Sequence, residues 1–248
     1  MAKIIDAAAI SGMVMERGEE DPHEALRQFH EAAERLNGTG VDLVVTCETM
    51  MMNQPAGTGE EPECPGKILD AYRTFARENR CVVAGAARTM TPEGPRQSIV
   101  YYGPNGENWE FTICFSSYYH GGTVMANWAF RTRAFQVGAQ KDIGSEIYDP
   151  LGRRINATAY YNRIARGRIN LDHIVCRRSG NSEKYPEIMR KYGKKVLIDL
   201  DSPSACGIIY SCNDEFTARD IAEEFGLVPR EELLRQSREL RKQVMGIR

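Results

Sequence analysis

The stretch Val41–Met52 reads VDLVVTCETMMM, and the interpretation of the chain starts from it. Its apolar run from Val41 to Val45 follows Gly40 and ends at a single carboxylate, Glu48. A short apolar run between a glycine and a polar stop predicts a buried strand. A carboxylate at the end of such a strand lies at the rim of a core, where burial raises its pKa and makes it a usable base. The alternative is that Glu48 only caps the strand in solvent.

Alternating patterns flank this strand, in the order strand 4–14, helix 22–36, strand 41–45, helix 65–79, strand 81–87 and strand 97–102. The Asn105-Gly106 pair predicts a hairpin that joins the last of these to a strand over residues 109–115. This order predicts an α/β fold with a mixed sheet. Functional sites collect at the carboxyl ends of strands in such sheets, which is where Glu48 is expected to lie.

The rest of the chain predicts a helix over 123–135, a strand–turn–strand unit over 143–161 and further strands to residue 211. From Glu215 onward the pattern predicts a charged helical hairpin with an apolar stripe of Leu233, Leu234 and Leu240. Such a stripe is more often a docking surface, on its own body or on a second subunit, than a ligand site. We therefore expect one domain over 1–212 and a helical appendage over 213–248.

Composition excludes several classes of protein. The 248 residues are 42% hydrophobic and 27% charged, which is ordinary for a soluble domain, and the net charge of -2 argues against nucleic acid as a partner. No apolar run has the length of a membrane span, and the N-terminus has no signal-peptide layout. Seven scattered cysteines favour reduced thiols in a cytoplasm. Cys206, Cys212 and His173 lack metal-ligand spacing, so we expect no zinc site.

Five motifs follow one another along the chain: Gly40–Glu48, Pro65–Gly85, Gln97–Glu107, Trp128–Phe135 and Gly144–Gly152, the last reading GSEIYDPLG. In this order they resemble the nitrilase superfamily of carbon–nitrogen hydrolases, over roughly residues 1–175. The resemblance implies a four-layer α-β-β-α sandwich with mixed sheets. It also implies assembly into homodimers or larger homo-oligomers.

The resemblance further implies a Glu–Lys–Cys triad that works without a cofactor. In such a triad a cysteine thiolate attacks an amide or nitrile carbon, and a thioester-type intermediate forms. A glutamate moves the protons, and a lysine ammonium stabilises the developing negative charge. Glu48 matches the glutamate, and Cys114, in the run FTICF, is the candidate nucleophile. No lysine follows Glu107 where the family places one, and the next lysine is Lys141.

A second alignment gives Cys114 a structural role. In it, residues 116–122 match a later strand end of the family, and Cys114 lies within that strand as a buried core residue. The interval from Gly106 to Trp128 is then several tens of residues too short, so the lysine, the cysteine elbow and a strand–helix unit are missing together. A smaller gap after Phe135 leaves 136–142 in place of another strand. We therefore expect a sandwich that is incomplete in the middle.

Three further residues are candidates for substrate binding: Tyr118, His120 and Arg133. His120 could equally be a solvated loop histidine, and Arg133 could be part of a helix-surface ion pair. The function expected from these features is an amidase-like hydrolase of a small amide, located in the cytoplasm, with Cys114 attacking and Glu48 assisting. The alternative is a truncated homologue without catalysis that acts as a subunit of an oligomer.

Overall fold

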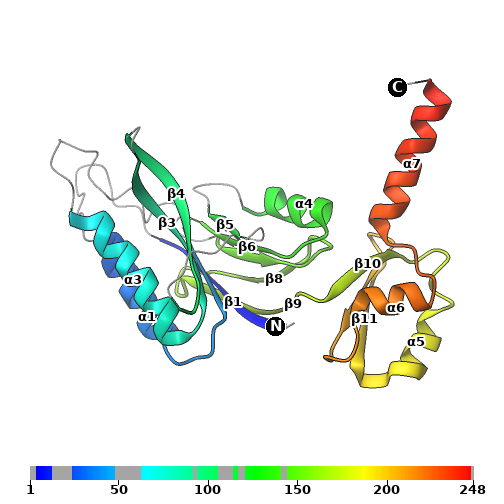
Figure 1. Ribbon diagram of the computed structural model, residues 1–248, viewed down its shortest axis with the longest axis horizontal. Coiled ribbons are helices and arrows are strands. Elements are labelled where there is room, and N and C mark those ends of the chain that lie inside the picture. Colours follow the sequence, from blue (N-terminus) through cyan, green and yellow to red (C-terminus); the bar gives the residue numbers. More distant parts are fainter. Residues whose placement is uncertain are drawn as a thin grey trace. The chain divides into compact units, whose positions relative to one another are not determined.

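The computed structural model describes residues 4–12, 24–47, 63–91, 94–105, 114–116, 121–140 and 144–246. The chain divides into two compact units. The first unit is Ile5–Ile169, and the second is Asn170–Arg248 together with Met1–Ile4. Both units mix helices and strands (Figure 1).

The first sheet of the first unit has the strand order β4-β3-β2-β1-β9. Its strands are β1 (Ile4–Ile10), β2 (Leu43–Thr46), β3 (Val82–Thr91), β4 (Gly94–Tyr102) and β9 (Ile164–Asn170). β2 runs parallel to both β1 and β3, whereas β3 and β4 are antiparallel, so the sheet is mixed as predicted. Leu43, Val44 and Val45 are at most 1% exposed, which confirms the buried strand of the Val41–Met52 stretch.

Helices α1 (Glu24–Leu36) and α3 (Glu63–Asn79) lie side by side on one face of this sheet (Figure 1). Apolar residues at helical spacing give each helix a buried face. The Phe29 ring of α1 meets the Tyr72 ring of α3 edge-on, with centroids 4.7 Å apart. Gly85 of β3 makes room for Tyr72, because a Cβ at that position would lie 2.3 Å from the tyrosine ring.

The second sheet of this unit has the order β5-β6-β7-β8. Its strands are β5 (Cys114–Ser116), β6 (Gln136–Ala139), β7 (Glu146–Tyr148) and β8 (Arg154–Ala157). Helix α4 (Thr123–Thr132) covers it through Met125 and Ala129, which pack on Tyr148. β2 contacts both β5 and β6, so the two sheets face each other. The layers are helix, sheet, sheet and helix, which confirms the predicted α-β-β-α sandwich.

The second unit contains the antiparallel sheet β10-β12-β11. Its elements are β10 (His173–Arg177), α5 (Tyr185–Tyr192), a 3₁₀ turn (Gly193–Lys195), β11 (Val196–Asp201), β12 (Cys206–Ser211), α6 (Ala218–Glu224) and α7 (Arg230–Met245). The predicted start of α6 is confirmed by a capping box, in which Thr217 and Asp220 exchange side-chain and backbone hydrogen bonds. Ile188, Ile209 and Ile221 meet in one core cluster.

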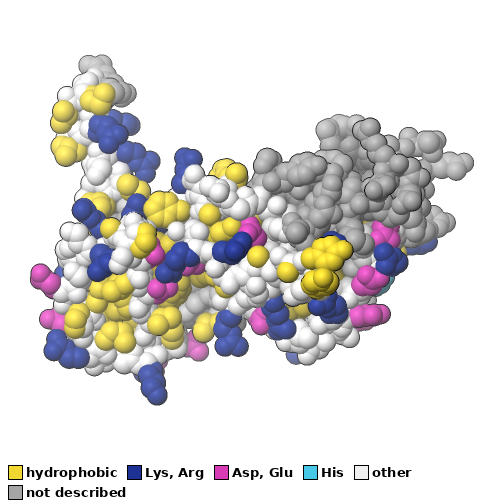
Figure 2. Space-filling view, turned by 180° about the vertical axis from the view of Figure 1, so that it is seen from behind, with side chains coloured by type: hydrophobic (Ala, Val, Ile, Leu, Met, Phe, Trp, Pro, Cys, Tyr) yellow, Lys and Arg dark blue, Asp and Glu magenta, His cyan; other side chains and the backbone are white. Residues whose placement is uncertain are grey.

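Helix α7 leaves this core after its first turn. Every residue from Leu234 to Gly246 is exposed, with Leu240 at 62% and Val244 at 78%. Apolar and basic side chains occupy different sides of this helix (Figure 2). The predicted apolar stripe therefore exists, and most of it has no cover within its own unit. Across the part of the chain that the structure describes, no helix is long and apolar enough to cross a membrane.

Two predictions about strands are wrong. The span 136–142 was expected to replace a strand, but Gln136–Ala139 forms β6, which pairs with β5 and β7. This run contains Gly138 and begins with a glutamine, so its pattern is too weak to reveal a strand. The hairpin between β4 and residues 109–115 is also wrong for Cys114 and Phe115. The antiparallel partner of β4 is β3, and β5 lies in the other sheet.

The boundary between the compact units differs from the expected one. The sequence placed it after residue 212, whereas the structure divides between Ile169 and Asn170. The physical reason is that β10, β12 and α5 bury their apolar side chains in the same cluster as α6. The extension of a nitrilase-like domain to residue 212 stays a prediction.

Buried thiols and phenols predict that stability falls at alkaline pH. Burial raises the pKa of Cys81 and Cys176 from 9.0, and that of Tyr148 and Tyr185 from 10.0, to about 12 in each case. The protonated forms are favoured in the folded state, so their contribution is complete below the unfolded pKa and is lost as pH rises toward 12. Each group lowers the unfolding free energy by up to about 1.4 kcal/mol per pH unit in this window.

Urea unfolding at a series of pH values above neutrality measures this loss. We expect the midpoint to stay level up to the pKa of a free thiol and to fall above it. The Cys81→Ala variant should show a shallower fall than the wild type, because one titrating group is gone. A midpoint that is flat through the alkaline range would contradict the account.

Candidate active site

The carboxyl ends of β1 and β2 lie next to each other at one edge of the first sheet. The two strands are parallel, with Ile10 opposite Thr46. Ser11 and Gly12 follow β1, and Cys47 follows β2. The Gly12 amide donates a hydrogen bond to the Cys47 sulfur at 2.9 Å, and Cys47 is fully buried. Glu48 is the next residue, so its chain position continues from this edge, although Glu48 itself lies outside the described residues.

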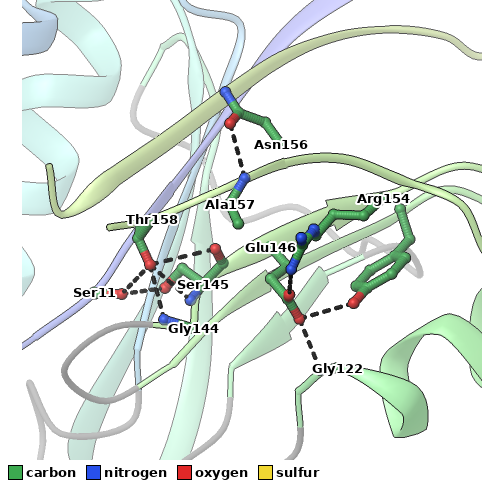
Figure 3. A network of polar contacts seen from close by, with 10 residues as sticks. Ser11, Gly122, Gly144, Ser145, Glu146, Arg154, Asn156, Ala157 and Thr158 are labelled. Atoms are coloured by element: carbon green, nitrogen blue, oxygen red, sulfur yellow. Dashed lines mark hydrogen bonds and ion pairs between the residues drawn. The ribbon is translucent and has the colours of Figure 1, made fainter. Parts of the chain in front are cut away.

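A cluster of three hydroxyl groups joins this edge to the second sheet (Figure 3). The Oγ atoms of Ser11 and Ser145 are 2.6 Å apart, and Ser11 Oγ lies 3.3 Å from Thr158 Oγ1. The backbone amides of Gly144 and Ser145 both donate to Thr158 Oγ1, and the amide of Gln140 donates to Ser145 Oγ. Because buried hydroxyls need partners, these bonds fix the edge of one sheet against the other.

Glu146 forms a second polar cluster in the same sheet (Figure 3). One carboxylate oxygen accepts from the Gly122 amide at 2.7 Å and from the Tyr148 hydroxyl at 2.9 Å, and the other accepts from Arg154 at 3.0 Å. Glu146 is 6% exposed. Burial, followed by the hydrogen bond to Glu146, raises the pKa of Tyr148 to about 12. The cluster holds the residue that precedes helix α4 against the second sheet.

The Glu146→Gln variant is expected to lower the free energy of unfolding by about 1–3 kcal/mol, because one of three charge-assisted or buried hydrogen bonds loses its acceptor. Thermal and urea unfolding measure the change. Glu239→Gln is the matched control, since Glu239 lies on the exposed face of α7 and pairs only with Arg235 in the described contacts. Its expected effect is within about 0.5 kcal/mol. Equal stability of both variants would contradict a structural role for Glu146.

Gln140 lies at the carboxyl end of β6, beside these two clusters. Its side chain packs against Gly121, where a Cβ would come within 1.9 Å of the Gln140 amide nitrogen. Gln140 is 6% exposed, and its Nε2 has no hydrogen-bond partner among the residues that the structure describes. Only a glycine fits at position 121 without moving this carboxamide.

The structure describes two of the five predicted site residues. Glu48, Tyr118 and His120 lie outside the described residues. Cys114 is the first residue of β5, opposite Val137 of β6, and its side chain is not part of the description. Arg133 ends α4 in the left-handed region, at φ 57°, and its guanidinium stacks on the Phe130 ring at 4.2 Å. The roles of all five residues stay predictions.

Among the described residues, no group of three histidines, cysteines, aspartates or glutamates could hold a metal ion. The nearest approach to a reactive thiol at the edge is Cys47, which is buried against the Gly12 amide.

Comparison with solved structures places this arrangement in a known group. The NitFhit protein of C. elegans matches with a TM-score of 0.55 at 11% identity, over 78% of this chain and 64% of that one. An amidase from Nesterenkonia sp. matches with 0.55 at 12%, over 77% of this chain and 98% of that one. XC1258 of Xanthomonas campestris, a CN-hydrolase superfamily protein, matches with 0.55 at 13%, over 79% and 100%.

The fold is that of the nitrilase, or CN-hydrolase, superfamily. The chain spans less than two thirds of the length of NitFhit and nearly all of the amidase and XC1258. Neither models of protein families nor curated protein sequences gave a match. At identities of 11–13%, the nitrilase fold is what the comparison establishes.

Sequence reasoning missed Ser11, Thr158, Gln140 and Glu146 as parts of this region. Ser145 and Glu146 lie inside the GSEIYDPLG motif, which was used only as a mark of the nitrilase family. The signal available was the alternation Ser145, Glu146, Ile147, Tyr148, in which a charged residue occurs in a short strand. A carboxylate in a buried strand requires partners, which could have directed attention to Glu146.

Proposed function

We propose that this chain is a carbon–nitrogen hydrolase that cleaves the amide bond of a small, non-peptide substrate through a cysteine thioester-type intermediate. The nitrilase fold carries the proposal, because an amidase and a CN-hydrolase superfamily protein share it over 98% and 100% of their own lengths. In the Nesterenkonia amidase the acetamide moiety of fluoroacetamide adds covalently to the active-site cysteine. The same chemistry is proposed for Cys114.

In the proposed reaction the Cys114 thiolate attacks the amide carbon, and a C–S bond forms. Glu48 gives a proton to the leaving nitrogen, the C–N bond breaks, and ammonia or an amine departs. Water, activated by Glu48, then breaks the thioester and yields a carboxylic acid. The proposed contacts of Tyr118, His120 and Arg133 orient the substrate. A cytoplasmic homodimer or larger homo-oligomer is the proposed form of the protein.

One observation favours a second candidate, a homologue without catalysis that serves as a subunit of an oligomer. Cys114 opens β5 instead of following a strand, so it lies two residues before the carboxyl end of β5 at Ser116. At about 3.3 Å per residue, this separates the two backbone positions by about 7 Å. A cysteine inside a strand is the position that the second alignment gave it, as a core residue.

Ammonia release from butyramide, measured with the purified full chain, distinguishes the two candidates. The hydrolase predicts turnover in the wild type and a loss of at least about 100-fold in Cys114→Ser, because the hydroxyl is a far weaker nucleophile without a dedicated base. Cys212→Ser is the matched control, since Cys212 is an exposed thiol in the other unit. Full turnover in Cys114→Ser would reject Cys114 as nucleophile, and no release from any small amide by the wild type would favour the second candidate.

A further inference from the structure

A second pocket lies on the first unit, between helix α1 and the turn that joins β8 to β9. It has a volume of about 230 Å³. Gln28, Glu31 and Arg35 of α1 line one side, and Tyr160, Tyr161 and Arg163 line the other. We call it the hairpin pocket, because residues Ala159 and Asn162 close a tight turn through a pair of backbone hydrogen bonds at 2.9 and 3.0 Å.

The two tyrosines at the tip of this turn are unusually exposed. Tyr160 is 72% exposed and Tyr161 is 92% exposed, and their rings meet edge-on with centroids 5.0 Å apart. Two-residue turns usually carry small or polar residues such as Asn-Gly. A pair of aromatic rings at the tip adds nothing to the core, so burial does not explain their presence. Their position along the pocket wall provides apolar contact for a bound carbon chain.

The charge of the lining is positive. Arg35 and Arg163 are the two guanidinium groups of the lining, and Glu31 is its one carboxylate. Glu31 forms an ion pair with Arg27, which offsets its charge. Arg35 donates to the Asn162 side chain at 3.0 Å, and this bond holds it over the turn. A planar guanidinium matches a carboxylate in two parallel hydrogen bonds.

The floor of the pocket reaches the polar cluster of the candidate site. Ser11 lines the pocket and is also hydrogen-bonded to Ser145 and Thr158, as Figure 3 shows. The Ser11 amide donates to the Arg163 carbonyl at 2.9 Å, so the floor and the wall are fixed to each other. A ligand here would lie next to the edge of the first sheet, on the outer side of the Ser11 hydroxyl cluster.

We propose that the hairpin pocket binds a short-chain carboxylate. The guanidinium groups of Arg35 and Arg163 bind the carboxylate, and the rings of Tyr160 and Tyr161 contact the carbon chain. The volume of about 230 Å³ equals that of about seven water molecules in the liquid, which is more than a lone inorganic ion needs. Binding here does not require hydrolysis, so the inference stands apart from the proposed function.

Titration of the full chain with succinate, followed by amide chemical shifts, tests the proposal. We expect shift changes in the turn at 159–163 and in the last turn of α1. We also expect Arg35→Gln and Arg163→Gln each to weaken binding by about 10-fold or more, since each removes a charge-assisted contact. Arg77→Gln is the matched control, because Arg77 is likewise a basic residue in the last turn of its helix. Its affinity should equal that of the wild type.

Three results would overturn the proposal. One is the absence of shift changes at these residues with up to about 10 mM succinate, a concentration that would reveal even weak binding. Another is equal binding of neutral succinamide, and the third is tighter binding of inorganic phosphate than of succinate. Because the shift map uses the wild type, it answers the question even where a variant fails to fold. Loss of amide hydrolysis with succinate binding intact would reject only the proposed function.

Discussion

The Tyr72→Ala variant is expected to unfold with about 3–5 kcal/mol less free energy than the wild type, the range for removing a fully buried large ring. Tyr72 has no exposed surface and lies between α3 and β3. Its ring contacts Phe29 edge-on, and its hydroxyl donates to the Ala86 carbonyl at 3.1 Å. Alanine would leave a cavity beneath the helices, because Gly85 carries no side chain that could fill it.

Urea unfolding of the full chain measures this effect. Tyr72→Phe is the first control, and it should lose only about 0.5–1.5 kcal/mol, the net value of a hydrogen bond. Tyr161→Ala is the second, because Tyr161 is 92% exposed and its removal should change stability by less than about 0.5 kcal/mol. Tyr72→Ala as stable as Tyr161→Ala would contradict the described packing of α1 and α3 on the first sheet.

The Glu48→Gln variant is expected to lose at least about 100-fold in kcat for a small amide, the range for removing a general acid–base group. The amide of glutamine keeps the size of the side chain and cannot accept or return a proton. KM should change by less than about threefold, since the proposed role of Glu48 is proton transfer in the transition state and not substrate binding.

Glu78→Gln is the matched control for this variant. Glu78 is an exposed residue near the end of α3, away from the carboxyl edge that Glu48 follows. Its kcat should equal that of the wild type, while the two variants should unfold with similar free energies. If Glu48→Gln retained full kcat, the glutamate of the proposed triad would have no catalytic role.

The regular part of the fold could be predicted from the sequence because its signals are local. Apolar spacing in α1 and α3, and the apolar runs of β2 and β3, locate these elements to within a few residues. The strand β6 could not be predicted, since four residues that include Gly138 give no period. The sheet to which β5 belongs was also misjudged, because sheet membership depends on tertiary pairing and not on a nearby Asn-Gly pair.

The boundary between the units illustrates the same limit. β10 and β12 look like any other buried strands in the sequence, and only the shared cluster with α6 assigns them to the second unit. For the candidate site, the family motif pointed to Glu48 and to the edge that it follows. Ser11, Thr158 and Gln140 lie far apart in the chain and match no motif, so only the folded edge brings them together.

Alkylation by iodoacetamide at neutral pH, located by peptide mass spectrometry, tests the proposed thiol chemistry most directly. Cys81 and Cys176 provide internal references for inert thiols, because burial raises their pKa to about 12. Cys212 is the exposed reference. Only a thiol with a lowered pKa reacts selectively here, so the hydrolase predicts that Cys114 is labelled at least about tenfold faster than Cys212. Labelling of Cys212 with Cys114 left unmodified would contradict it.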